Sequence, residues 1–241
     1  YESSTTVNAT TQGSIGITAK IDDEIVDVND YAVHISGLKA GTHTLTITTI
    51  PDENHTAVTK TANITINKIS STVDVNDTVL DYGDSTNVSV ITKGADGFTA
   101  KIDNQDVNVI DNLIPISNLK ARNHILTITT IPDTNHTATT KTANITINKI
   151  SSTVEVNDVY LDYGETTNIN ATTKGAEGIT AKINGKDIAI TGFTILIAGL
   201  DAGNHTLTIT TIPDENHTTA SKTATITVNK INSTLTVDNV E

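Results

Sequence analysis

Residues 47–56 read Ile-Thr-Thr-Ile-Pro-Asp-Glu-Asn-His-Thr, and this stretch reveals how the chain is organised. It returns at 128–137 and again at 209–218 with one substitution, Thr134 in place of Glu. Lys68 returns in the same register as Lys149 and Lys230, so the chain repeats every 81 residues without insertion or deletion. A fixed period of this length is typical of one structural unit repeated in tandem.

The period predicts the domain boundaries. Residues 1–67 form a first repeat that lacks its opening strand, because Tyr1 aligns with Tyr82 and Tyr163. Residues 68–148 and 149–229 form the second and third repeats, and 230–241 match the first strand of a next repeat. We expect a window cut from a longer repetitive protein, with any targeting or anchoring signal outside it.

The composition favours strands and excludes several function classes. Aromatic residues make up 3% of the chain, and Cys and Trp are absent, so an aliphatic core of Ile, Val and Leu is expected. The net charge is −13 with no basic patch, which argues against nucleic acid as a partner. No apolar run is long enough for membrane insertion within this segment. The absence of Cys excludes a disulfide framework and leaves the compartment open.

Alternating residues place strands along each repeat. Val88 and Val90 alternate with polar residues, and so do Ile114 and Ile116. The pair Asn184-Gly185 between two alternating segments predicts a hairpin. About seven such strands with one apolar face predict an all-β fold of tandem immunoglobulin-like β-sandwich domains. Four apolar positions hold across the repeats: Ile17, Phe98 and Ile179; Val26, Val107 and Ile188; Val33, Ile114 and Ile195; Ile35, Ile116 and Ile197.

The segments that join the repeats leave little room for a linker. Residues 66–73 run from the last strand of one repeat into the first strand of the next and contain neither Gly nor Pro. A flexible linker would be rich in Gly and Ser. We therefore expect restricted hinging and an extended rod, with about 40 Å added by each domain.

Three motifs recur in the same order along the repeats: the turn Tyr-Gly-Asp at 82–84, the strand Ala-Gly-Asn-His-Thr-Leu-Thr-Ile-Thr at 202–210, and the turn Pro-Asp-Glu-Asn-His at 213–217. In this order they resemble the bacterial and archaeal Ig-like tandem repeat family of adhesin-like cell-surface proteins. That turn departs from the family pattern, with Pro-Asp for Gly-Asp and His for Tyr, and Arg122 replaces a Gly of the other repeats. The resemblance covers all three repeats and implies extracellular stalks.

Asparagine sequons are candidate glycan acceptors if the protein is secreted. In a chain this rich in Asn and Thr, such triplets also arise by chance. Several fall on predicted outward faces or in exposed turns. The eleven sites are Asn8, Asn54, Asn63, Asn76, Asn87, Asn135, Asn144, Asn170, Asn204, Asn216 and Asn232.

Two histidines recur in each repeat, and packing is the favoured interpretation for both. One begins a strand (His43, His124, His205) and is expected to cap the core with its ring nitrogens bonded to backbone. The other follows the Pro-Asp turn (His55, His136, His217). Zinc needs three or four convergent ligands. Calcium needs six to eight oxygens, more than Asp52-Glu53 or Asp214-Glu215 supplies unless a turn acid such as Asp84 or Glu165 adds to them.

No pattern for catalysis stands out. Nucleophile elbows, phosphate loops and paired catalytic carboxylates are not found in the sequence, so we expect no enzyme activity and no cofactor. A crosslink between Lys68 and Asn63, as in some surface sandwiches, is disfavoured because Thr225 stands at the Asn63 position of the third repeat.

Three functions remain open. The leading one is a structural stalk of an extracellular adhesin-like surface protein, whose partners are neighbouring repeats of the same protein. The second is a multivalent module that binds a receptor or glycan by avidity. The third is a filament subunit, in which residues 230–241 of one molecule complete the first repeat of the next by strand addition. The favoured location is the cell surface.

Overall fold

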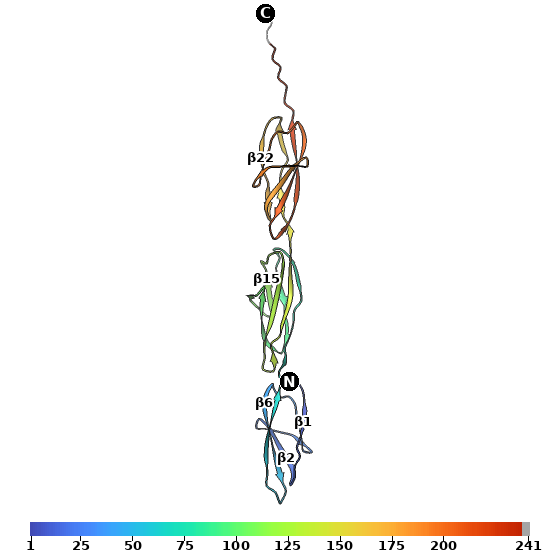
Figure 1. The fold of residues 1–241 in the computed structure, drawn as a ribbon, viewed down its shortest axis with the longest axis vertical. Coiled ribbons are helices and arrows are strands. Elements are labelled where there is room, and N and C mark those ends of the chain that lie inside the picture. The colour runs from blue at the N-terminus through green and yellow to red at the C-terminus, as the bar shows by residue number, and fades with distance from the viewer. Residues whose placement is uncertain (238–241) are drawn as a thin grey trace. The chain divides into compact units, whose positions relative to one another are not determined.

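The computed structural model describes residues 1–237, and in this part of the chain every regular element is a strand (Figure 1). Among these residues no helix has the length and apolar character to cross a membrane. Contacts divide the chain into two compact units. One comprises Tyr1–Asn76, Asn87–Pro115 and Ile125–Asn144, and the other comprises Asp77–Thr86, Ile116–His124 and the chain from Ile145 onward.

The strands follow the 81-residue period. The first repeat contains β1 (Thr5–Asn8), β2 (Ser14–Ile21), β3 (Glu24–Val26), β4 (Val28–Asn29), β5 (Ala32–Ile35), β6 (Gly41–Pro51) and β7 (Thr59–Ile66). The second repeat contains β8 (Ile69–Ser70), β9 (Thr72–Asp74), β10 (Thr78–Asp81), β11 (Thr86–Ser89), β12 (Ile91–Lys93), β13 (Ala95–Ile102), β14 (Gln105–Val107), β15 (Leu113–Ile116), β16 (Asn123–Pro132), β17 (His136–Thr137) and β18 (Thr140–Asn148).

The third repeat contains the same sequence of elements with one additional short strand, β26. Its strands are β19 (Ile150–Ser151), β20 (Thr153–Glu155), β21 (Val159–Asp162), β22 (Thr167–Asn170), β23 (Thr172–Lys174), β24 (Ala176–Ile183), β25 (Lys186–Ile188), β26 (Ile190–Thr191), β27 (Thr194–Ile197), β28 (Gly203–Pro213), β29 (His217–Thr218) and β30 (Ser221–Asn229).

The first repeat is a two-layer sandwich. Its sheets have the orders β1-β5-β4 and β3-β2-β6-β7, with antiparallel pairing throughout. Val33 and Ile35 come from one sheet, Ala19, Ile21 and Leu45 from the other, and all belong to one buried cluster. Two antiparallel sheets of three and four strands around one aliphatic core form the predicted immunoglobulin-like β-sandwich.

The third repeat adds an opening segment to the same plan. Its larger sheet has the order β21-β30-β28-β24-β25, in which β21 pairs with β30 in parallel, and its smaller sheet has the order β22-β27-β26. The facing sides of these two sheets contribute to one core, which includes Ile195, Ile197, Leu207 and Ile209, each 0% exposed. Of the four apolar positions predicted for the core, three are buried in every repeat, while Val26, Val107 and Ile188 are half-buried.

The predicted hairpin at Asn184-Gly185 is confirmed. A two-residue loop joins β24 to β25, and both residues have positive φ, 49° and 79°. The other repeats make the same turn with non-glycine pairs, Asp22-Asp23 at 47° and 70° and Asp103-Asn104 at 48° and 67°. Asp and Asn tolerate this left-handed conformation because their short polar side chains can hydrogen-bond locally.

The opening strands pair within their own repeats. β9 pairs with β12 and β20 pairs with β23, both antiparallel, so Val73 and Val154 are only 9% and 5% exposed. Residues 230–237, predicted to open a further repeat, form no strand. The rest of that prediction, 238–241, lies outside the described residues. The domain boundaries stay a prediction, because the two compact units do not follow them.

Candidate functional site: the junctions between repeats

Each junction between successive repeats lies inside one compact unit. The first junction belongs to the unit that begins at Tyr1, and the second junction belongs to the other unit. At the first junction β7 ends at Ile66 and β8 begins at Ile69, which leaves two residues between the strands. The second junction has the same form, because β18 ends at Asn148 and β19 begins at Ile150. The prediction that no flexible linker separates the repeats agrees with this continuity.

The opening segment of the second repeat is held along its length. β8 pairs with β17 in parallel, and the backbone N–H groups of Ile69 and Ser71 donate to the carbonyls of Asn135 and Thr137, at 3.2 and 3.0 Å. The hydroxyls of Ser71 and Thr130 share a hydrogen bond of 2.7 Å, and each residue is 2% exposed. Buried hydroxyls must be paired, so this serine and threonine fix the register of the segment.

The third repeat reproduces these bonds. Ser152 N donates to the Thr218 carbonyl at 2.9 Å, and the hydroxyls of Ser152 and Thr211 share a bond of 2.6 Å. These two residues are 3% and 2% exposed. The same buried hydrogen bond between a serine and a threonine therefore occurs in the second and third repeats.

The Pro-Asp-x-Asn-His turn is organised by its aspartate. Asp133 Oδ1 accepts the backbone N–H of Asn135 at 2.8 Å and Nδ1–H of His136 at 2.6 Å. Asp214 accepts the equivalent bonds from Asn216 and His217 at the same distances. The histidine hydrogen bond is the main reason that the pKa of each aspartate lies below its usual value.

The turn histidine lies between a glycine of its own repeat and a tyrosine of the preceding one. A Cβ added to Gly175 would lie 2.3 Å from the ring of His217, so only glycine fits beneath it. Tyr82 approaches the same ring edge-on, with centroids 5.4 Å apart. Tyr1 and His136 make the same contact at 5.6 Å. The packing expected of this histidine is confirmed for His136 and His217, and the aromatic partner of each comes from the neighbouring repeat.

The turn asparagine also reaches across the junction. Asn135 Oδ1 accepts the backbone N–H of Ala40 at 2.9 Å, and Asn216 Oδ1 accepts that of Ala121 at 2.9 Å. Lys120 adds an ion pair to Glu215 at 2.6 Å. That pair has no counterpart at the first junction, because Thr134 replaces the glutamate there.

In the first repeat the same turn is held by bonds within that repeat. Asp52 accepts the same bonds from Asn54 and His55, and its pKa is lowered for the same reason. The side chain of His55 is 53% exposed, against 15% for His136 and 14% for His217. The turn therefore forms on its own, and the junction covers it.

The sequon asparagines fall into two groups. Nine are exposed in the structure, and only Asn135 and Asn216 are half-buried. These two are the asparagines that bond across the junctions. The exposed nine are Asn8, Asn54, Asn63, Asn76, Asn87, Asn144, Asn170, Asn204 and Asn232.

The strand histidines follow the prediction at one ring nitrogen. Nε2 of His43, His124 and His205 bonds to the carbonyls of Lys39, Lys120 and Asp201 at 2.8, 2.9 and 2.8 Å. We expected backbone groups to bond both ring nitrogens, and this was wrong for Nδ1 of His43 and His205. Asp22 accepts from Nδ1 of His43 at 2.6 Å, and the Asn184 side chain donates to Nδ1 of His205 at 2.8 Å.

The Nδ1 partner of His43 is a carboxylate, whereas that of His205 is a neutral amide. The Asp22 hydrogen bond, followed by the Lys39 carbonyl, raises the pKa of His43. The pKa of Asp22 is lowered, first by the backbone N–H of Thr44 and then by His43. His205 faces a neutral amide instead, so the charge pair is confined to the first of these two repeats.

The residues considered for a metal site or a crosslink have other positions or partners in the described structure. Within residues 1–237, no group of three or more His, Asp or Glu side chains could hold a metal ion. The aspartates of the turns instead bond their own histidines. Asn63 lies opposite Thr44 in the β6–β7 pair, and Lys68 is exposed.

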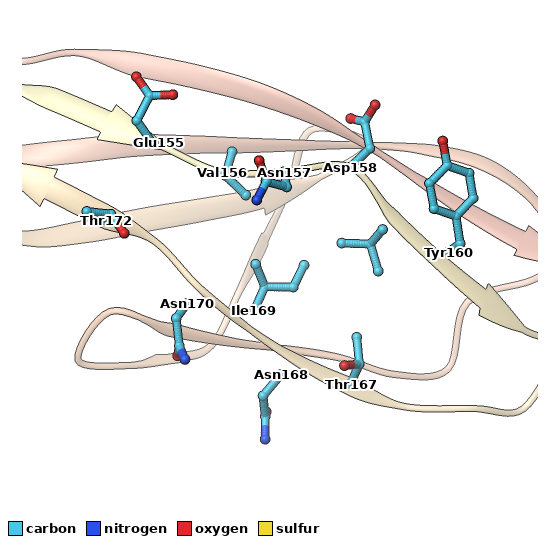
Figure 2. Close-up of a pocket in the computed structure, with 11 residues that line it drawn as sticks. Glu155, Val156, Asn157, Asp158, Tyr160, Thr167, Asn168, Ile169, Asn170 and Thr172 are labelled. Atoms are coloured by element: carbon cyan, nitrogen blue, oxygen red, sulfur yellow. The ribbon is translucent and has the colours of Figure 1, made fainter.

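A polar groove of about 470 Å³ opens on the third repeat between residues 155–160 and β22 (Figure 2). Val156 and Ile169 form its apolar floor, while Asn168 points away from it. Tyr160 at one end is 72% exposed, but its counterpart in the second repeat is Val79. A binding surface of repeated exposed aromatics, which multivalent recognition would favour, is therefore not built at this position.

Comparison with known families and with curated proteins gives no match. Similar solved structures include the I9–I11 tandem of titin, with 12% identity over 95% of this chain and 94% of that one and a TM-score of 0.33. Extracellular domains 3–5 of Drosophila OTK have 9% identity over 95% and 92%, with a TM-score of 0.37. Fibronectin(III)-like modules of Clostridium thermocellum CbhA have 14% identity over 66% and 94%, with a TM-score of 0.29.

Proposed function

We propose that this chain is a structural spacer: a stalk segment of a longer extracellular, adhesin-like surface protein that presents or links adhesive regions. The observation that carries the proposal is that both junctions use the same contacts. Tyr1 and Tyr82 pack on a histidine, and Ala40 and Ala121 donate to an asparagine. Contacts repeated in this way restrict hinging, which is what a spacer requires.

The test measures how far neighbouring repeats move relative to one another. The chain contains no cysteine, so spin labels can be placed at will. We would label Thr99→Cys and Thr180→Cys, which occupy equivalent exposed positions in the second and third repeats, and measure the distance distribution by electron double resonance. A narrow distribution is expected.

The control variant opens the junction without touching either label. Tyr82→Ala together with Asn216→Ala removes one aromatic contact and one hydrogen bond, and should broaden the distribution. A distribution that is already broad in the unaltered junction would contradict a spacer.

We further infer that a secreted form carries glycans on the exposed sequons rather than at the junctions. Asn63 and Asn144 are exposed on strands, whereas Asn135 and Asn216 are half-buried and bonded to the preceding repeat. Glycopeptide mass spectrometry of protein from a glycosylating host should find Asn63 and Asn144 occupied well above the other two. Equal occupancy of the strand and junction sites would count against this inference.

A further inference from the structure

The hairpin between β24 and β25 contains the one asparagine of the sequence that is followed by glycine, Asn184 before Gly185. Both residues are exposed in the structure. A glycine leaves its backbone nitrogen unshielded, because it has no Cβ. That nitrogen can attack the side-chain amide carbon of the preceding asparagine, which is the first step of deamidation.

The side-chain amide of Asn184 is held at both of its polar atoms by β28. Oδ1 accepts the backbone N–H of Thr206 at 2.9 Å, and Nδ2 lies 2.8 Å from Nδ1 of His205. The backbone N–H of Asn184 donates in turn to the Thr206 carbonyl at 2.9 Å. The amide therefore has a defined orientation against the neighbouring strand.

These two partners match the charges that develop when a nucleophile attacks the amide carbon. The carbonyl oxygen becomes an oxyanion, and the Thr206 N–H already donates to it, as a donor of an oxyanion hole does. The amide nitrogen becomes basic once the carbon is tetrahedral, and it must take up a proton before it leaves. Nδ1 of a protonated His205 lies within hydrogen-bond reach of this nitrogen and can deliver that proton.

The second ring nitrogen positions His205 for this transfer. Nε2 bonds to the Asp201 carbonyl at 2.8 Å, and the histidine is half-buried. These contacts hold the imidazole so that Nδ1, and not Nε2, faces Asn184. The proton donor therefore lies beside the leaving nitrogen without a rotation of the ring.

The first repeat already contains the product of such a reaction as an encoded residue. By the 81-residue period Asp22 is the equivalent of Asn184. Its Oδ1 accepts the backbone N–H of Thr44 at 2.8 Å, and its Oδ2 bonds Nδ1 of His43 at 2.6 Å. A backbone N–H and a histidine hold Asn184 in the same way, so the hairpin has partners ready for an aspartate at this position.

We propose that Asn184 deamidates within the folded third repeat, with the Thr206 N–H as oxyanion donor and His205 as proton donor. The Gly185 nitrogen loses its proton to water and bonds Cγ of Asn184. The Cγ–Nδ2 bond then breaks, ammonia leaves with the proton from His205, and a cyclic succinimide remains. Solvent returns a proton to His205. Water opens the succinimide to aspartate or isoaspartate, so the net change is uptake of water and release of ammonia.

This inference goes beyond the spacer function, because it makes the third repeat a site of self-modification. Formation of aspartate replaces a neutral amide beside His205 by a carboxylate, which is the pairing that Asp22 and His43 have in the first repeat. The second repeat has Asp103 at this position, which carries no amide to lose. The reaction is therefore confined to the third of these hairpins.

The experiment follows the peptide that contains Asn184 by mass spectrometry while residues 1–241 are incubated at neutral pH. The parent should convert to the aspartyl and isoaspartyl forms, and Asn184→Asp supplies the standard for the first of these. His205→Gln should convert at least about tenfold more slowly, because a positioned proton donor is lost. Asn104 is the internal control, since it precedes Gln105 in the equivalent turn and should stay unconverted.

The direction of the His205→Gln effect separates a proton donor from a simple restraint. If the histidine only holds the amide in place, its removal frees the turn and speeds conversion. In urea the histidine is no longer positioned, so the parent and His205→Gln should convert at the same rate. Amide NMR spectra show whether the variant is folded in the native buffer.

Two results would overturn the proposal. One is conversion of folded His205→Gln as fast as that of the parent, or faster. The other is a folded parent that stays unconverted after the chain in urea has converted completely. Neither result bears on the label distances between neighbouring repeats, so the spacer function would be judged separately.

Discussion

Tyr82 and His217 belong to successive repeats, and their rings meet edge-on with centroids 5.4 Å apart. Gly175 also lies against this imidazole. Asp214 fixes the ring through Nδ1 at 2.6 Å. The histidine is thus oriented by its own repeat before the tyrosine reaches it, and the contact loses little side-chain entropy when the repeats meet.

Replacing the tyrosine should weaken the second junction. Tyr82→Ala removes an edge-on aromatic pair worth about 0.5–1.5 kcal/mol beyond its buried area, and hydrogen exchange at residues 216–218 should quicken. Tyr163→Ala is the matched control, because its side chain is 50% exposed and should change little in a dilute sample. Equal effects of the two substitutions would contradict a role for the ring contact.

The asparagine bond should contribute measurably to the same junction. Asn216→Ala leaves the backbone N–H of Ala121 without its acceptor, which costs about 1 kcal/mol. Thermal unfolding of the variant should begin earlier than that of Asn54→Ala, because the Asn54 turn is seen bonding within its own repeat. If Asn54→Ala is as destabilising, the asparagine acts only within its own turn.

Glycine under the histidine ring should be intolerant of substitution. Gly175→Ala combines a φ of +66° with a Cβ 2.3 Å from His217, so the ring must shift and a loss of about 3 kcal/mol or more is expected. Gly199→Ala has the same φ of +66° with nothing within 4 Å of its Cβ. The difference between the unfolding midpoints of the two variants in denaturant measures the cost of the steric clash between the new Cβ and His217. Equal midpoints would show that the His217 ring moves aside at no cost.

Acid should weaken the turns. The pKa values of Asp133 and Asp214 are lowered by their histidines, so the contribution of each pair is complete above the ordinary aspartate pKa. It is lost as the pH falls through the lowered value. Denaturant midpoints measured between pH 5 and pH 2 should fall less for Asp214→Asn than for the parent, while its midpoint at pH 5 is already reduced. Parallel curves would contradict this linkage.

The Asp22 carboxylate should make the stability of the first repeat depend on the protonation of His43. Asp22 raises the pKa of His43, so the pair stabilises the first repeat below the usual histidine pKa and this contribution disappears as the pH rises through the raised value. NMR titration of the parent and of Asp22→Asn should show a lower midpoint for His43 in the variant. Equal midpoints in the two proteins would assign the raised pKa to another cause.

Local patterns predicted the sandwich, because strand alternation depends only on neighbouring residues. Val33 and Ile35 are buried on one face, and Asn184-Gly185 forms its hairpin. The turns at Asp22-Asp23 and Asp103-Asn104 were less visible, since neither pair contains glycine. Their positive φ becomes evident only from alignment with the third repeat.

The junction contacts could not be predicted in the same way. The turn histidine suggested packing, but nothing local shows that Tyr82 is its partner, because that depends on how two folded repeats meet. Asn135 and Asn216 were identified only as sequons, and their bonds to Ala40 and Ala121 come from the neighbouring repeat. In the structure Asn135 and Asn216 are half-buried and bond the neighbouring repeat, and this role is not visible in the sequon itself.

Every repeat carries one half of the joint at its Tyr–Ala end and the complementary half at its Asp-x-Asn-His turn. A head-to-tail joint of this kind uses two different surfaces, so each repeat can take part in one joint through either half. Unequal recombination that adds or deletes whole 81-residue steps would leave every remaining joint intact. The length of the array is therefore free to evolve without any new interface having to arise.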